Sequence, residues 1–105
     1  MKSRKDGQTL YLMPETDLIA SRIEELRDYF SEQLEVNKDF TLVILEVSGV
    51  DFVDSLGINL IVGLYRQVTT ESKRMEIIGA GKDFMKVANF FRLPSIFTVK
   101  GEKEA

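Results

Sequence analysis

Short apolar segments with strand character alternate along the chain with longer segments that have helical periodicity. In chain order, these segments are strand 8–13, helix 17–36, strand 40–47, helix 55–70, strand 74–80, helix 81–93 and strand 95–100. Only a few residues connect each strand to the next helix, so neighbouring strands are expected to be joined by right-handed crossovers. The alternation therefore predicts an α/β fold, with a small mixed, largely parallel β-sheet and amphipathic helices packed on it.

The two longer helical segments differ in how their apolar residues are arranged. Segment 17–36 places apolar residues three and four positions apart on one stripe, and Thr16 or Asp17 is expected to cap its start. Segment 55–70 has a wider apolar face that contains Gly57 and Gly63. Each glycine costs about 1 kcal/mol of helix stability relative to alanine. The two glycines therefore predict a close approach between this helix and the sheet.

The run FTLVILEV at 40–47 is nearly continuous in apolar and β-branched residues. Such a run is typical of a central strand that is either covered on both faces or paired in parallel with its neighbours. With 105 residues, the chain predicts a single domain, 1–105, in which residues 1–7 and 101–105 are flexible ends.

The chain contains no cysteine and no histidine. Disulfides, thiolate zinc sites, thiol nucleophiles and serine–histidine pairs are therefore excluded, and neither a metal site nor a cofactor is expected. The formal net charge of −3 does not favour binding to nucleic acid, which is negatively charged. Together these features favour a binding protein over an enzyme.

Nothing in the sequence predicts insertion into a membrane. The longest apolar runs, LVIL and LIV, are far shorter than the roughly 18 residues that a membrane span requires. The basic N-terminus, MKSRKDGQ, is not followed by an apolar segment, so we expect no secretory signal and a cytoplasmic location. These observations leave the oligomeric state open.

Two loops between a strand and a helix are candidate functional sites, because such loops carry function in largely parallel sheets. The first, GAGK at 79–82, has the context of a phosphate-binding loop but lacks its spacing. Glu76 stands where the loop's first glycine should be, and Asp83 stands where serine or threonine should be. A simple turn is the better interpretation.

The second loop, VDFVDSLG at 50–57, follows the central strand and begins the second helix. Asp54 suits the N-cap, and Ser55 then takes the first helical position, where backbone N–H groups lack intrahelical partners. A phosphate on Ser55 would meet the positive end of the helix dipole. With Asp51 and Asp54 nearby, it would make the surface strongly acidic. The loop is therefore either a purely structural helix start or a phosphorylation switch that repels a docked partner.

A receiver-type domain, phosphorylated on aspartate, is a further alternative, because it is also a small α/β protein. Its clustered carboxylates would hold a divalent ion, and Glu15, Asp17, Asp51 and Asp54 follow the first and second predicted strands. The acceptor aspartate should lie at the end of the central strand, but the chain there reads Glu46-Val47-Ser48.

The stretch FTLVILEVSGVDFVDSLGINLIVGLYRQV, residues 40–68, resembles the signature of the STAS domain, and more specifically that of the bacterial anti-sigma factor antagonists. LMPETDLIAS at 12–21 is similar to the strand-to-helix passage of that family, and FFRLPSIFTV at 90–99 to its closing segment. The resemblance implies a single STAS-like domain in which Ser55, directly after Asp54, is the phosphorylation site.

The resemblance also implies a non-enzymatic regulator that works by partner switching. The unphosphorylated domain would bind an anti-sigma factor with serine-kinase activity, phosphorylation of Ser55 would end this binding, and a serine phosphatase would restore it. The kinase would bring the ATP and magnesium, so this chain would need no cofactor. By the same resemblance, the expected partner-binding residues are Asp17, Asp54, Leu56, Gly57, Ile58 and Asn59.

The chain departs from the family pattern at several positions. Pro14 and Asn59 stand where the family usually has glycine. The first strand of the family's N-terminal hairpin is expected to be missing or reduced within MKSRKDG, and the final helix to be at most a stub in GEKEA. STAS domains also act as scaffolds or transporter-associated subunits that are not phosphorylated, and this alternative stays open.

Overall fold

The computed structural model describes residues 1–102. In chain order, its strands and α-helices are β1 (Lys2–Asp6), β2 (Thr9–Met13), α1 (Ile23–Val36), β3 (Leu42–Glu46), α2 (Ser55–Thr70), β4 (Arg74–Ala80), α3 (Lys82–Phe90) and β5 (Thr98–Gly101). Two short 3-10 helices, η1 (Ala20–Arg22) and η2 (Leu93–Ser95), precede α1 and β5.

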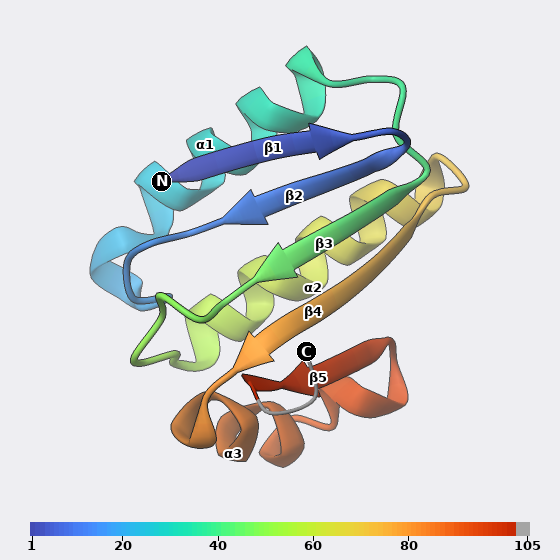
Figure 1. Ribbon diagram of the computed structural model, residues 1–105. Coiled ribbons are helices and arrows are strands. Elements are labelled where there is room, and N and C mark those ends of the chain that lie inside the picture. Colours follow the sequence, from blue (N-terminus) through green and yellow to red (C-terminus); the bar gives the residue numbers. More distant parts are fainter. Residues whose placement is uncertain (103–105) are drawn as a thin grey trace.

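The strands form one five-stranded sheet in the order β1-β2-β3-β4-β5. β1 pairs antiparallel with β2, and β2 through β5 are parallel. Because the parallel strands follow one another without a reversal, right-handed crossovers bring their helices to the same side of the sheet. Figure 1 shows α1 and α2 behind the strands and α3 beside β5. The predicted α/β fold with a mixed, largely parallel sheet is confirmed.

The core lies between the sheet and the helices. Alternate residues of the central strands point to the helices and are buried, among them Leu10, Leu12, Val43, Leu45 and Ile77. They meet the buried apolar residues of α1 and α2, namely Leu26, Phe30, Leu34, Ile58, Ile61, Leu64 and Val68. Strand β3 is therefore paired in parallel on both sides. Helices of the described part of the chain cover only one of its faces, so the alternative expectation, cover on both faces, is not met within residues 1–102.

The N-terminal residues form a strand of the sheet, contrary to the expectation of a flexible end and of a missing hairpin strand. Every side chain of β1 is exposed, but Lys2 through Asp6 pair in register with Met13 through Thr9. The Tyr29 hydroxyl of α1 fastens this hairpin, since it accepts from the backbone N–H of Met13 at 3.1 Å and donates to the carbonyl of Lys2.

At the other end, Gly101 belongs to β5 rather than to a flexible end. The remaining part of that prediction, including the expected stub of a final helix, falls on 103–105, outside the described residues.

The boundaries of some elements match the predictions and those of others do not. α2 and β4 have the predicted bounds, whereas α1 begins at Ile23 instead of residue 17, after η1. Neither Thr16 nor Asp17 caps α1, because the segment before the helix is extended and packs against the loop that precedes α2. α3 ends at Phe90, and Pro94 lies in η2.

Candidate functional site

The N-terminus of α2 presents Ser55 to solvent. Asp54 is the N-cap, with an extended backbone, and its Oδ1 accepts from the backbone N–H of Gly57 at 2.9 Å. Ser55 is the first helical residue and is exposed, and its hydroxyl makes no hydrogen bond to another described residue. A group attached to this oxygen would stand at the positive end of the helix dipole.

Two acidic side chains connect the loop before α2 with the segment before α1. Asp54 Oδ2 accepts from the backbone N–H of Ala20 at 2.9 Å. In the opposite direction, Asp17 Oδ1 accepts from the backbone N–H groups of Asp51 and Phe52, both at 3.1 Å. Each loop thus supplies a carboxylate to the backbone of the other, and we call this arrangement the reciprocal clasp.

Backbone hydrogen bonds between the same two segments complete the connection. The N–H of Leu18 donates to the carbonyl of Phe52 at 2.9 Å, and the N–H of Asp54 donates to the carbonyl of Leu18 at 3.1 Å. Leu18 and Val53 form an isolated parallel bridge, and both side chains are buried. The two segments are therefore paired like short parallel strands, and Ser55 follows directly after one of them.

Gly57 is required by this packing. A Cβ at Gly57 would lie 1.9 Å from the carbonyl oxygen of Leu18 and 2.8 Å from its carbon. The close approach predicted for this glycine is thus to the segment before α1 rather than to the sheet. Gly63 differs, because a Cβ there would meet nothing within 4 Å.

The hydrogen bonds of Asp54 also change its acidity. Donation from the Gly57 N–H favours the carboxylate and lowers the pKa of Asp54 below its ordinary value, partial burial opposes this, and the Ala20 N–H lowers the pKa further. Asp54 therefore remains charged at neutral pH while it holds both α2 and the Ala20 backbone.

The expected partner-binding residues divide into exposed and buried ones. Leu56 is 49% exposed and Asn59 is exposed, and so is Phe52, which is 60% exposed and was not among the expected partner-binding residues. Ile58 is only 3% exposed and Gly57 is covered by Leu18. Gly57 and Ile58 are therefore structural residues, which corrects their assignment to a partner surface.

Asp17 and Asp54 are only partly exposed, and their carboxylates are engaged by backbone N–H groups. The structure assigns them to the reciprocal clasp. Their position on the rim of a partner surface stays a prediction.

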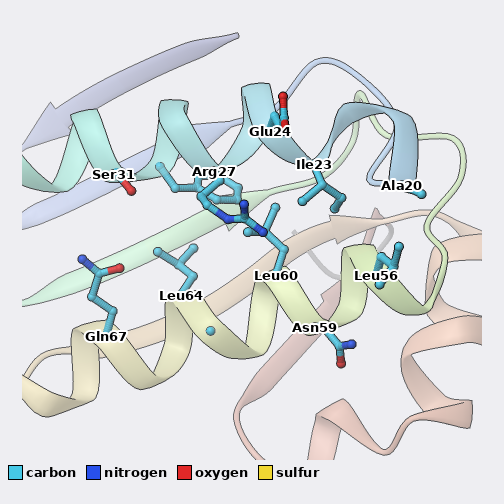
Figure 2. A pocket seen from close by; sticks show the side chains of 12 residues that line it. Ala20, Ile23, Glu24, Arg27, Ser31, Leu56, Asn59, Leu60, Leu64 and Gln67 are labelled. Atoms are coloured by element: carbon cyan, nitrogen blue, oxygen red, sulfur yellow. The ribbon is translucent and has the colours of Figure 1, made fainter.

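A groove runs from the Ser55 end of α2 along its boundary with α1. It encloses about 740 Å³, and Leu56 and Asn59 line it near Ser55. Figure 2 shows Arg27 of α1 and Leu60 of α2 pointing toward one another across the groove. Gly63 leaves part of its floor without a side chain. Gly63 is the sequence signal for this groove, although its place in the apolar face of the helix predicts a contact with the sheet instead.

The structure does not support a receiver-type domain. The receiver fold has the strand order 2-1-3-4-5, with a reversal at which its site lies, whereas this sheet runs from β1 to β5 without a reversal. No cluster of three or more acidic side chains able to hold a metal ion occurs within residues 1–102. The GAGK turn lies beside the end of β3, since a Cβ at Gly79 would be 3.2 Å from Ser48.

Known proteins that are similar to this chain point to one family. A family model described as the STAS domain matches residues 1–104. No curated protein matches the chain. Among the helices described, none is long and apolar enough to cross a bilayer.

Several solved structures share the fold. A candidate anti-sigma factor antagonist from Thermotoga maritima aligns over 94% of this chain and 84% of its own, with a TM-score of 0.84 and 15% identity. The unphosphorylated anti-sigma factor antagonist SpoIIAA of Bacillus aligns over 98% and 90%, with a TM-score of 0.76 and 20% identity. A sulfate transporter family protein from Wolinella succinogenes aligns over 89% and 76%, with a TM-score of 0.74 and 12% identity. At these identities the likeness concerns the fold alone.

Proposed function

Because the chain belongs to the STAS domain family, we propose that it is a phosphorylatable anti-sigma factor antagonist with Ser55 as the phosphoacceptor. The observation that carries the proposal is the position of Ser55. Its hydroxyl is exposed at the first position of α2, directly after the loop that the reciprocal clasp holds in place. A kinase can reach this oxygen without unfolding any element.

The partner in this proposal is an anti-sigma factor with serine-kinase activity. It binds the unphosphorylated surface formed by Phe52, Leu56 and Asn59, and it extends into the groove between α1 and α2. Burial of the two exposed apolar side chains supplies about 25 cal/mol for each Å² removed from water. The kinase brings ATP and magnesium, so this chain acts as substrate and ligand and not as an enzyme, in the cytoplasm.

Phosphorylation acts in this proposal through charge. A phosphate adds about −1.5 to −2 charges at neutral pH, on a short segment that also carries Asp51, Asp54 and the exposed side chains of Phe52 and Leu56. A partner that covers these apolar groups would have to desolvate the phosphate without compensation, which costs several kcal/mol. The helix dipole stabilises the phosphate on the free domain. A serine phosphatase removes it and restores binding.

The test is phosphorylation by a co-encoded anti-sigma kinase. After incubation with ATP, the intact protein is expected to gain the mass of one phosphate, and Ser55→Ala is expected to gain none. Ser48→Ala, at the next exposed serine toward the N-terminus, serves as the control and should be phosphorylated like the wild type. Phosphate on another residue, or on none, contradicts the assignment.

A second candidate function is that of a constitutive scaffold or transporter-associated subunit. The observation that favours it is the fold shared with the sulfate transporter family protein. In this case the domain binds its partner without a phosphate cycle, and Ser55→Asp binds that partner as tightly as the wild type does.

A further inference from the structure

Within residues 1–102, no helix lies over one face of the central strands. α1 and α2 lie behind the strands, and Figure 1 looks onto the opposite face, which we call the open face. Side chains alternate between the two faces of a strand, and Leu10, Leu12, Val43 and Leu45 are buried on the helix side. The open face therefore carries the other residues of β2 and β3, which are Thr9, Tyr11, Met13, Leu42, Ile44 and Glu46. All six are only partly buried.

The register of the sheet arranges the open face in rows across the strands. In one row Asp6, Thr9, Leu42 and Arg74 are successive partners, and in the next row Arg4, Tyr11, Ile44 and Glu76 are. Within each row the charges on β1 and β4 are opposite, and their signs exchange between the two rows. Neutral side chains of β2 and β3 separate them.

These four charges have no ion-pair partner among the described residues. They cannot pair across the sheet, because β1 and β4 are three strand spacings apart, about 14 Å. Arg4 instead rests on the ring of Tyr11, with its guanidinium carbon 4.4 Å from the ring centroid. The face thus combines an apolar centre with unpaired charges of both signs on its two flanks.

We propose that a second copy of this chain covers the open face. A twofold axis parallel to the strands, between β2 and β3, places β1 over β4 of the partner and β2 over β3 of the partner. Arg4 then faces Glu76 of the partner subunit, and Asp6 faces Arg74 of the partner subunit. Tyr11 lies over Ile44 of the partner subunit. The two sheets pack face to face at the usual separation of about 10 Å.

The twofold arrangement makes the face complementary to itself. Every Arg4–Glu76 and Asp6–Arg74 contact occurs twice, which is the property of an isologous interface. The next row places no like charges opposite one another, because Lys2 would face Ile78 of the partner subunit, and Met13 would face Glu46 of the partner subunit. Pairing between β1 edges is disfavoured, since KSRKD carries the charges that natural edge strands use against it.

The expected dimer is weak. Four strands and three rows cover about 20 Å by 16 Å, whereas a standard stable interface buries about 800 Å² on each partner. We therefore expect association that depends on concentration and weakens with added salt. This surface is independent of Ser55, so the dimer and the phosphate switch succeed or fail separately.

The test uses charge reversal in two singly substituted proteins. Sedimentation of the intact chain, from about 1 μM to about 1 mM, is expected to show a monomer–dimer equilibrium. Arg4→Glu and Glu76→Arg should each raise the dissociation constant about tenfold or more, because two attractive pairs become repulsive. Mixed in equal amounts, the two variants should form heterodimers, since every contact between positions 4 and 76 again joins opposite charges.

Lys5→Glu is the matched control, because it makes the same change on the same strand but on the side of the buried Leu10. It should leave the dimer unchanged, and circular dichroism should show that all variants are folded. A wild type that is monomeric throughout, dimers that tolerate both substitutions, a mixture that stays monomeric, or a larger assembly would each overturn the proposal.

Discussion

Asp17 and Asp54 each hold the backbone of the loop to which the other belongs. Asp17 accepts from the N–H groups of Asp51 and Phe52, and Asp54 accepts from the N–H of Ala20. The position of Ser55 therefore depends on a segment that lies almost 40 residues earlier in the chain. This dependence makes the site testable by substitutions that never touch the serine itself.

Replacement of Asp54 by alanine is expected to destabilise the fold by about 1–2 kcal/mol, because α2 loses its N-cap and Ala20 loses its acceptor. Urea denaturation followed by circular dichroism measures this loss. Asp51→Ala is the control: the Asp51 side chain is exposed, and a change of more than about 0.5 kcal/mol there would show that charge rather than the clasp is responsible.

Acid should weaken the clasp. Since the pKa of Asp54 is lowered by folding, its stabilising effect is complete above its ordinary pKa of about 3.9 and is lost as the pH falls through the lower, folded value. The difference in unfolding free energy between the wild type and Asp54→Asn should therefore shrink from about pH 5 toward pH 2. A difference that is constant over this range would contradict the role of the carboxylate.

Two glycines of the same helix should respond oppositely to alanine. Gly57→Ala places a methyl group 1.9 Å from the Leu18 oxygen and is expected to cost about 3 kcal/mol. Gly63→Ala places the same group where nothing lies within 4 Å and should stabilise α2 by about 0.4–1 kcal/mol. Thermal unfolding of both variants compares them directly, and equal effects would refute the close approach at Gly57.

The proposed partner should distinguish two neighbouring apolar residues. Leu56→Ala removes exposed surface and is expected to weaken partner binding while it leaves stability nearly unchanged. Ile58→Ala removes a buried side chain and is expected to lower stability by about 2–5 kcal/mol. Calorimetric titration, paired with urea denaturation, separates the two effects. Loss of binding without loss of stability in Ile58→Ala would argue against this division.

A fixed negative charge at Ser55 should imitate part of the phosphate. Ser55→Asp is expected to weaken binding of the proposed anti-sigma partner by about 1–3 kcal/mol, and more at low salt than at high salt. Ser55→Ala provides the neutral control and should bind as the wild type does. Equal affinities for the two variants would mean that charge is not the signal.

The sequence predicted those helices and strands that carry a cap or a hydrophobic pattern within their own residues. α2 begins after an N-cap aspartate and has a wide apolar face, and β4 alternates clearly, so both bounds were recovered. β1 was missed because all five of its side chains are exposed and charged or polar, which leaves no alternation to detect. Its stability comes from pairing with β2 and from Tyr29, and both lie outside the segment.

The site was predicted in part for a similar reason. Ser55 and Asp54 are placed by local capping, and the DSLG motif contains both. The roles of Asp17 and Gly57 depend on contact between two loops that are distant in sequence, and single-chain patterns carry no information on such contacts. From the sequence alone, Asp17 is therefore expected to cap a helix, and Gly57 is expected to allow the close approach of the sheet or of a partner.

The reciprocal clasp also bears on timing. A surface that is already held in one shape needs little conformational change when a partner binds. The association rate is then governed by diffusion and orientation rather than by a slow rearrangement. In the proposed phosphate switch, the lifetime of each state would then be set by the enzymes that add and remove the phosphate.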